Sequence, residues 1–303
     1  MTSTVRSFAA VGGMVAACIL ATPVRSVASE KESEPDHHEP SDLGVLNFFT
    51  AGWNEPEADR HRTTRDMALF RVETAYVEKE FRLDFVHSNY RGDSTYSGGY
   101  ATKASLAYAL NRRMQLEVSG YYAWNVLPGE PPANGAAASV ALRFALVDGA
   151  AMNYAFQIEL ETPNRGIGEG GTAMSYSLAG WQDVSRWIPA LGPVGLYYSL
   201  KWVNVLGSLE PEEPHNILSW TISAARQWTP PDFPVVGNFT TFLEAWMETA
   251  LDGAPAGKLN FTLTPGVRFW FLPENSVILG VDIPLNNSAP YSATWRATYF
   301  LGF

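Results

Sequence analysis

The chain has 303 residues, a net charge of −10 at pH 7, 13% aromatic residues and only 17% charged residues. The negative charge argues against a nucleic-acid partner. No apolar run reaches the ~18 residues that a membrane-spanning helix needs. A charged fraction below the ~25% of typical soluble domains, with many aromatic residues, is compatible with strands that cross a membrane or with an exported β-sandwich.

The first 28 residues have the composition of an export signal. Arg6 supplies a positive charge, residues 7–22 are apolar, and residues 26–28 (Ser-Val-Ala) form a small-x-small cleavage site. Lipoprotein processing at Cys18, the single cysteine, is the alternative, although apolar residues continue beyond it. Residues 29–42 are acidic and contain proline, so we expect a disordered tail there.

From residue 67 onward, apolar and polar residues alternate in repeated short runs, which is typical of strands with one apolar face. The run at 152–161 alternates most cleanly. Thirteen runs can be traced, at 68–76, 81–86, 100–110, 114–122, 138–146, 152–161, 174–179, 194–202, 218–224, 239–248, 259–269, 277–283 and 293–303.

The connections between these runs alternate between short and long, as in Asp148-Gly149 and residues 91–99. This indicates an up-and-down meander with short turns at one rim and long loops at the other. Two connections on the short-turn rim, 183–193 and 228–236, are longer than tight turns. If both chain ends lie on the turn side, residues 43–53 must add a strand, which gives fourteen. Their alternation is poor, so a plug or periplasmic segment there with twelve strands is the alternative.

The last run ends at Phe303, and every second residue before it is apolar: Leu301, Tyr299, Ala297, Trp295 and Ala293. It resembles the terminal strand of bacterial outer-membrane β-barrels, in which this end is read by the barrel-assembly machinery. The resemblance implies an all-β, closed antiparallel transmembrane barrel over residues 43–303. It also implies a location in the bacterial outer membrane, with lipid and the assembly machinery as partners. A weaker resemblance is to barrels for uptake of aromatic or fatty compounds, for which no distinguishing motif can be quoted.

Aromatic residues gather towards the ends of the predicted strands, where amphipathic rings would lie at the headgroup level of a membrane. This predicts aromatic girdles made of Tyr76, Tyr100, Tyr122, Trp124, Trp202, Trp228, Trp270 and Tyr299.

If the apolar faces contact lipid, the opposite faces carry charges into the lumen. Charges in a confined lumen must be paired or hydrated, so the lumen could be a filled structural network or a passage that selects solutes. We expect a narrow channel or transporter for small molecules, with a filled structural or adhesive barrel as the alternative. The residues expected to line it are Arg71, Glu73, Arg82, Asp84, Lys103, Glu117, Arg143, Glu159, Glu161, Lys201, Glu244, Glu248, Arg268, Asp282 and Arg296.

A barrel lipase or protease is a further alternative, because His87 and Ser88 supply residue types that hydrolysis needs. Adjacent residues on a strand point to opposite faces, so these two cannot hydrogen-bond through adjacency. No Gly-x-Ser-x-Gly, zinc spacing, phosphate loop or dinucleotide fingerprint is present. The sequence therefore predicts no enzyme activity, no cofactor and no metal.

Overall fold

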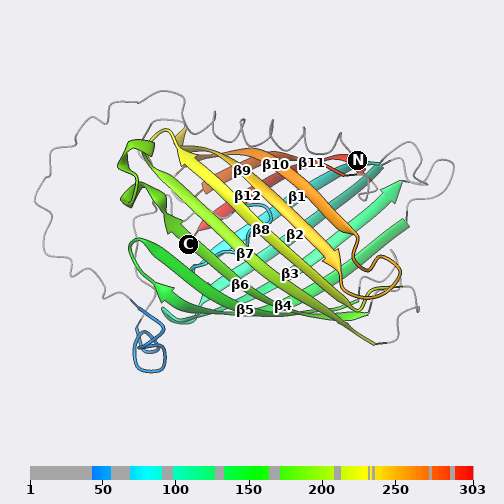
Figure 1. Cartoon of the computed structure of the whole chain (residues 1–303), viewed down its shortest axis with the longest axis horizontal. Helices are drawn as coiled ribbons and strands as arrows, with labels where there is room; N and C mark the ends of the chain where they lie inside the picture. Colours follow the sequence, from blue (N-terminus) through cyan, green and yellow to red (C-terminus); the bar gives the residue numbers. More distant parts are fainter. Residues whose placement is uncertain are drawn as a thin grey trace, which may run out of the picture.

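The chain folds into a single closed antiparallel β-barrel (Figure 1). The computed structural model describes residues 43–55, 69–90, 98–126, 133–163, 171–207, 213–230, 233, 236–272, 275–286 and 291–302. Each strand pairs with its neighbours in the sequence, and β1 closes the barrel against β12 with Glu80 opposite Gly302. The up-and-down meander expected from the sequence is confirmed.

Twelve strands form the barrel. They are β1 (Glu80–Tyr90), β2 (Gly98–Ala109), β3 (Met114–Val126), β4 (Ala133–Asp148), β5 (Met152–Glu161), β6 (Thr172–Asp183), β7 (Val194–Leu206), β8 (Asn216–Gln227), β9 (Gly237–Ala250), β10 (Leu259–Leu272), β11 (Asn275–Pro284) and β12 (Tyr291–Gly302).

The alternation of side chains puts the apolar residues on the outer surface. On β4, Val140 and Leu142 are exposed, whereas Ala141 and Arg143 between and beside them are buried. The same exposed apolar band continues around the barrel on Phe85, Leu106, Val118, Leu160, Leu178, Leu200, Ile222, Leu279 and Trp295. A soluble sandwich would bury this face, so the barrel presents the surface that a hydrocarbon layer requires.

The described helical residues are few. They form η2 (Val184–Arg186) and η3 (Pro189–Leu191), both in the connection from β6 to β7. None of the helices in the described ranges could cross a bilayer, on grounds of length and hydropathy.

The count of fourteen strands is wrong, and the alternative of twelve is confirmed. Residues 43–53 form no strand, because Asn47 draws the chain into turns: its backbone oxygen accepts from Ala51 and its side chain accepts from Gly44. Residues 69–79 form no strand either. They lie inside the barrel up to Lys79, whose ammonium is 5.8 Å from the exposed ring of Tyr108 at the rim. Their alternation of apolar and charged residues reflects contacts with different parts of the lumen rather than a lipid face and a water face.

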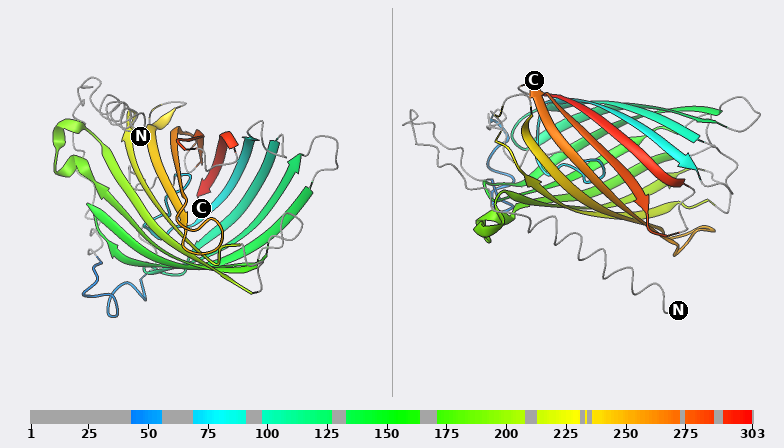
Figure 2. Two further views of the ribbon diagram at one scale, coloured as in Figure 1. Left: turned by 45° about the vertical axis from the view of Figure 1, so that its right-hand side comes forward. Right: turned by 90° about the horizontal axis from the view of Figure 1, so that it is seen from above.

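Residues 43–55, called here the rim segment, are fixed to the ends of the hairpins at the short-turn rim. Leu43 exchanges two backbone hydrogen bonds with Asp148, at 3.1 and 2.9 Å. The buried guanidinium of Arg113 donates to backbone oxygens of Gly44, Asn47 and Ala51. Figures 1 and 2 show this dark blue segment at the same end of the barrel as η2 and η3, projecting beyond the wall.

The aromatic girdle is partly as predicted. On the loop side of the outer surface, the rings of Tyr100 and Trp124 stack at 5.2 Å, and Tyr176 stacks on Trp202 at 5.5 Å. On the turn side, Tyr198 donates a 2.9 Å hydrogen bond to Tyr154. The assignment of Trp270 and Tyr76 is wrong, because Trp270 is buried on the inner face and Tyr76 is buried in the lumen.

Several expectations fall outside the described residues. They are the export signal at 1–28, Cys18 with its alternative processing, the acidic tail at 29–42, and the terminal Phe303.

Candidate functional site: the barrel lumen

Thirteen of the fifteen residues predicted to line the lumen belong to barrel strands, on the side opposite the apolar outer band. These are Arg82 and Asp84 on β1, Lys103 on β2, Glu117 on β3, Arg143 on β4, Glu159 and Glu161 on β5, Lys201 on β7, Glu244 and Glu248 on β9, Arg268 on β10, Asp282 on β11 and Arg296 on β12. Arg71 and Glu73 also lie inside the barrel, but residues 69–79, called here the lumen segment, carry them.

The lumen segment begins in an apolar cluster that crosses the barrel interior. Leu69, Phe70 and Val72 are buried against residues from opposite parts of the wall, among them Phe242 on β9, at 5.8 Å between ring centroids from Phe70. The other wall members of this cluster are Ala179, Trp181, Tyr197, Ala225, Ile278 and Phe300. The sequence did not predict this cluster, because the alternation at residues 68–76 indicated a strand of the barrel wall.

Two glycines on the inner face make room for these rings. A Cβ atom at Gly280 would lie 2.5 Å from the ring of Phe70, and one at Gly266 would lie 2.2 Å from the ring of Phe242. Real Cβ contacts are essentially never so short, so the wall is hollowed where the lumen segment packs. Inward-facing glycines at 266 and 280, one on each of two paired strands, were the available sequence signal for an internal segment.

Glu244 holds the start of the lumen segment by its backbone. Its fully buried carboxylate accepts hydrogen bonds from the N–H groups of Phe70, Arg71 and Val72, each at 3.2 Å. Three consecutive donors form a concave anion site, and a buried carboxylate is costly unless it is bonded in this way. This contact therefore fixes the segment at a defined depth in the barrel.

Arg71 links the lumen segment to β11 and β12. Its guanidinium lies 2.5 Å from Asp282, which also pairs with Arg296 at 2.8 Å and accepts from Thr264 at 2.7 Å. The Arg71 guanidinium carbon lies 4.1 Å from the ring centroid of Trp246, within cation–π distance. Arg71 and Arg296 share the buried carboxylate of Asp282, so these three residues carry a net positive charge. The carboxylate of Glu244 offsets that charge.

A second ion cluster joins the lumen segment to β5 and β7. The ammonium of Lys201 lies 3.2 Å from Glu73 and 3.0 Å from Glu159. Hydroxyl groups of Ser139 and Ser175 donate to the same Glu159 carboxylate. Glu73 is thus held by the wall on the side opposite Asp282.

The end of the lumen segment is tied to β3 and β4. Arg143 on β4 donates to the backbone oxygen of Tyr76 at 3.5 Å, and it is held by Gln157 at 2.9 Å and Glu117 at 3.6 Å. Gln115 accepts the backbone N–H of Glu78 at 2.8 Å. Lys103 is only loosely paired, because its ammonium lies 3.9 Å from Glu117 and 37% of its side chain is exposed.

The remaining inner charges lie near β1 and the last strands. Arg82 pairs with Asp84 two residues further along β1, at 2.9 Å. Arg82 and Arg268 both lie over the ring of Phe300, with their guanidinium carbons at 5.2 and 5.5 Å from its centroid. Both guanidinium groups therefore pack against the inner face beside the β1–β12 seam.

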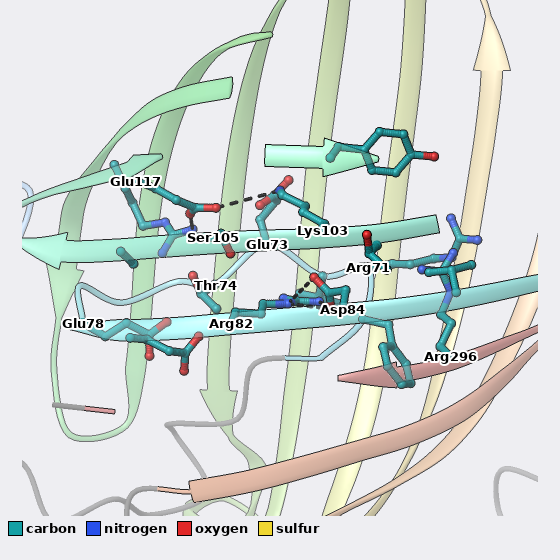
Figure 3. Close-up of a pocket in the computed structure, with 18 of the residues that line it drawn as sticks. Arg71, Glu73, Thr74, Glu78, Arg82, Asp84, Lys103, Ser105, Glu117 and Arg296 are labelled. Carbon is teal, nitrogen blue, oxygen red and sulfur yellow. Dashed lines mark hydrogen bonds and ion pairs between the residues drawn. The ribbon is translucent and has the colours of Figure 1, made fainter. Parts of the chain in front are cut away.

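A cavity of about 240 Å³ remains between the lumen segment and the inner faces of β1, β2 and β3 (Figure 3). It follows β2 from Ala101 to Ala107, which at ~3.4 Å per residue is about 20 Å of strand. Five basic and five acidic residues line it: Arg71, Glu73, Glu78, Glu80, Arg82, Asp84, Lys103, Glu117, Arg143 and Arg296.

A second cavity of about 240 Å³ lies on the loop side, along β3, β4 and β5. It includes Glu159 and Glu161 and shares Lys103 and Tyr121 with the first cavity. The two cavities therefore meet at Lys103, the loosely paired cation. Together they lie along one side of the lumen, whereas the opposite side is filled by the apolar cluster.

The residues considered for hydrolysis are not arranged as a catalytic pair. His87 stacks on Tyr100 at the outer surface, with ring centroids 4.5 Å apart. The Ser88 hydroxyl bonds instead to Thr294, a buried residue of β12, at 2.9 Å. Across the described part of the chain, no group of three or more His, Cys, Asp or Glu residues is placed to hold a metal.

The closed twelve-strand meander, the apolar outer band and the polar inner face define an outer-membrane β-barrel of the porin-like class. No protein-family model matches the chain, and no curated relative matches it. Among solved structures, it is similar to the COG4313 outer membrane channel from Pseudomonas putida F1, with a TM-score of 0.57 and 12% identity, over 78% of this chain and 100% of that chain.

Two further solved structures are similar at lower scores. The KdgM porin matches with a TM-score of 0.47 and 10% identity, over 73% of this chain and 99% of that one. The NanC porin matches with a TM-score of 0.47 and 9% identity, over 74% and 98%. At 12% identity, the similarity to the COG4313 channel establishes a shared barrel fold.

Proposed function

We propose that this protein is a passive channel of the bacterial outer membrane for small polar or charged solutes. The observation that carries the proposal is the cavity beside the lumen segment, which is lined by five basic and five acidic residues. Solutes would move along the inner faces of β1–β3, past Lys103, while the apolar cluster keeps the other side closed. Those predicted lining residues that line the two cavities beside β1–β5 act in this proposal as the charged sides of that route.

The charges on the route favour polar over apolar solutes. A dehydrated apolar compound gains little from a lining of ionised groups, which must stay hydrated or paired. The weaker resemblance to barrels that take up aromatic or fatty compounds therefore receives no support from the lining. Lipid of the outer membrane and the barrel-assembly machinery, through the strand that ends at Phe303, belong to the same proposal as partners.

Conductance in planar bilayers tests the proposal, with each sample first shown to be folded by its different gel mobility before and after heating. Wild-type protein should give small, discrete conductance steps. Replacing the loosely paired cation by Lys103→Glu should shift the reversal potential in a KCl gradient towards cation selectivity, because field lines in a confined lumen are focused. Arg186→Glu, in the exposed connection from β6 to β7, is the matched control.

A structural barrel with a filled lumen is the second candidate, and a specific observation favours it. The lumen segment is fixed by the Glu244, Asp282 and Lys201 contacts described above, on several sides of the wall. Folded protein that never conducts, and whose Lys103→Glu variant never conducts, would support this second function. An enzyme is not proposed, because His87 and Ser88 face opposite sides of β1.

A further inference from the structure

The rim segment exposes three large apolar side chains at the turn-side end of the barrel. Leu46 is 105% exposed, Phe49 is 88% exposed and Val45 is 63% exposed. These side chains lie in a segment whose other residues are well anchored. Phe48, their neighbour, packs under the Arg113 guanidinium at 5.2 Å and against Trp53 at 5.4 Å. The segment therefore presents an apolar outer face and an inner face committed to the barrel.

The position of the rim segment along the barrel is fixed by the strand register. Leu43 pairs with Asp148, and Asp148 pairs with Asn153 at the start of β5. The next residue, Tyr154, points outward at the turn side. It forms a hydrogen-bonded group there with Tyr198 and Gln182. One residue of strand rises ~3.4 Å, so the rim segment starts within a few ångströms of that aromatic group.

Outward tyrosines at a barrel rim lie at the headgroup level of the membrane. The rim segment starts at this level, and both views of the barrel show it projecting sideways beyond the wall at this end (Figures 1 and 2). Its exposed apolar residues therefore belong to a segment at the turn-side edge of the apolar outer band. Apolar and aromatic side chains at that depth are the groups with which interfacial segments enter a membrane.

The connection from β6 to β7 repeats the feature at the same rim. Trp187, directly after η2, is 56% exposed and Ile188 is 50% exposed. Figure 2 shows η2 and η3 at the same end as the rim segment. Two separate segments at the same end of the barrel therefore carry exposed apolar residues, which a periplasmic surface facing only water would not require.

We propose that the rim segment is a lipid-binding foot: Val45, Leu46 and Phe49 insert into the interfacial region of the turn-side leaflet. Arg113 and the Leu43–Asp148 pair transmit this attachment to the β2–β3 and β4–β5 hairpins. The occupant is membrane lipid rather than a second protein, because the segment starts at the level of the turn-side tyrosines of the lipid-facing surface. The inference is independent of whether the lumen conducts.

Spin-label accessibility tests the foot in the full chain carrying Cys18→Ser. Single variants Leu46→Cys and Phe49→Cys would be labelled and reconstituted into vesicles of phosphatidylethanolamine with a minor fraction of phosphatidylglycerol. Exposure to dissolved oxygen relative to a water-soluble nickel chelate should rise severalfold at both sites over Asn54→Cys, an exposed position of the same segment. Leu142→Cys, on the outer band, is the reference for lipid exposure.

Two results would overturn the proposal. Labels at 46 and 49 could be as accessible to the nickel chelate as the label at 54, which places the face in water. Alternatively, both reagents could be excluded, which indicates cover by protein, such as a second copy of the chain. Gel mobility before and after heating shows that each labelled variant has a folded barrel, so a folding failure is recognised separately.

Discussion

The carboxylate of Glu244 on β9 accepts the backbone N–H of Phe70 across the barrel lumen at 3.2 Å. The following two N–H groups converge on the same carboxylate. A wall residue thus recognises the backbone of the lumen segment, whatever side chains that segment carries. The width of the proposed passage depends on this attachment, because the segment forms one side of the cavity along β1–β3.

Replacing Glu244 by glutamine should loosen the lumen segment. The neutral amide offers one weaker acceptor oxygen in place of a charged carboxylate, and hydrogen bonds to charged groups contribute ~1.5–3 kcal/mol each. We expect larger and noisier conductance steps from Glu244→Gln, and faster proteolysis within residues 69–79. The measurement is single-channel recording beside limited proteolysis of the same folded sample.

Glu248→Gln is the control for this prediction. Glu248 lies on the inner side of the same strand, near the loop rim, where it lines a different cavity with Pro214 and Lys258. It should leave conductance noise and proteolysis at wild-type levels. If Glu244→Gln behaves like Glu248→Gln, the three backbone contacts do not fix the segment.

A methyl group at residue 280 should act on the same segment from another side. In Gly280→Ala, the new Cβ would lie 2.5 Å from the ring of Phe70 and 3.0 Å from the backbone oxygen of Pro265. Overpacking of this kind costs ~1–3 kcal/mol, so the folded band on gels should be lost at a lower temperature. Gly120→Ala, whose Cβ meets nothing within 4 Å, should leave that temperature unchanged.

A double variant shows whether the cost arises from the Phe70 contact. Phe70→Leu removes the ring atoms that the methyl group would strike, so its combination with Gly280→Ala should cost less than the sum of the two changes. Residues in contact show coupling of ~0.5–3 kcal/mol. Strict additivity would mean that the strain lies in the wall, at Pro265, and not in the lumen segment.

The sequence predicted the wall strands well because each strand has an apolar outer face and a largely polar inner face. The run at 152–161 coincides with β5, and Leu142 and Trp295 are exposed on the outer surface as expected. Alternation failed at residues 68–76, since a segment inside a lumen also alternates between apolar contacts, such as Phe70 with Phe242, and ion pairs, such as Arg71 with Asp282.

The charges of the site were predicted, but their partners were not. The alternation of side chains along each strand predicted that Glu244 and Lys201 point into the lumen. Their contacts with residues 70–73, however, join positions more than a hundred residues apart. Periodicity is a local property and contains no such pairing. The inward glycines at 266 and 280 were informative, because a polar lumen wall has no need of missing side chains unless another group occupies the space.

Removal of the Arg113 side chain should detach the rim segment without unfolding the barrel. Arg113 is fully buried, and besides its four hydrogen bonds to the rim segment it donates to backbone oxygens of Ala145 and Leu146. Arg113→Met leaves those oxygens without a donor, and each buried unsatisfied group costs ~1–3 kcal/mol. We expect greater mobility of a spin label at residue 49 and faster proteolysis near residues 43–55.

Arg186→Met is the comparison variant at the same rim. Arg186 is about half exposed, and its pairing with Asp183 at 3.7 Å is a surface contact, which contributes ~0–1 kcal/mol. It should leave the label at residue 49 as immobile as in the parent. Equal mobility in the two variants would show that Arg113 does not anchor the segment.

The second anchor of the rim segment should depend on pH. A hydrogen bond from Arg112, at 2.5 Å, holds the pKa of Glu55 below its ordinary value of 4.5. Because the folded-state pKa is lowered, the contribution of this pair is complete above about 4.5, the unfolded value, and is lost as the pH falls through the folded value. Glu55 is 45% exposed, so the effect is that of a screened surface pair and is small.

Label mobility at residue 49, followed from pH 7 downward, measures this loss. It should stay constant above about pH 4.5, the ordinary value, and rise as the pH falls through the lowered folded-state pKa. Glu55→Gln should show the raised mobility already at pH 7 and no further change in that window. A pH response that persisted in Glu55→Gln would show that the Glu55–Arg112 pair is not its source.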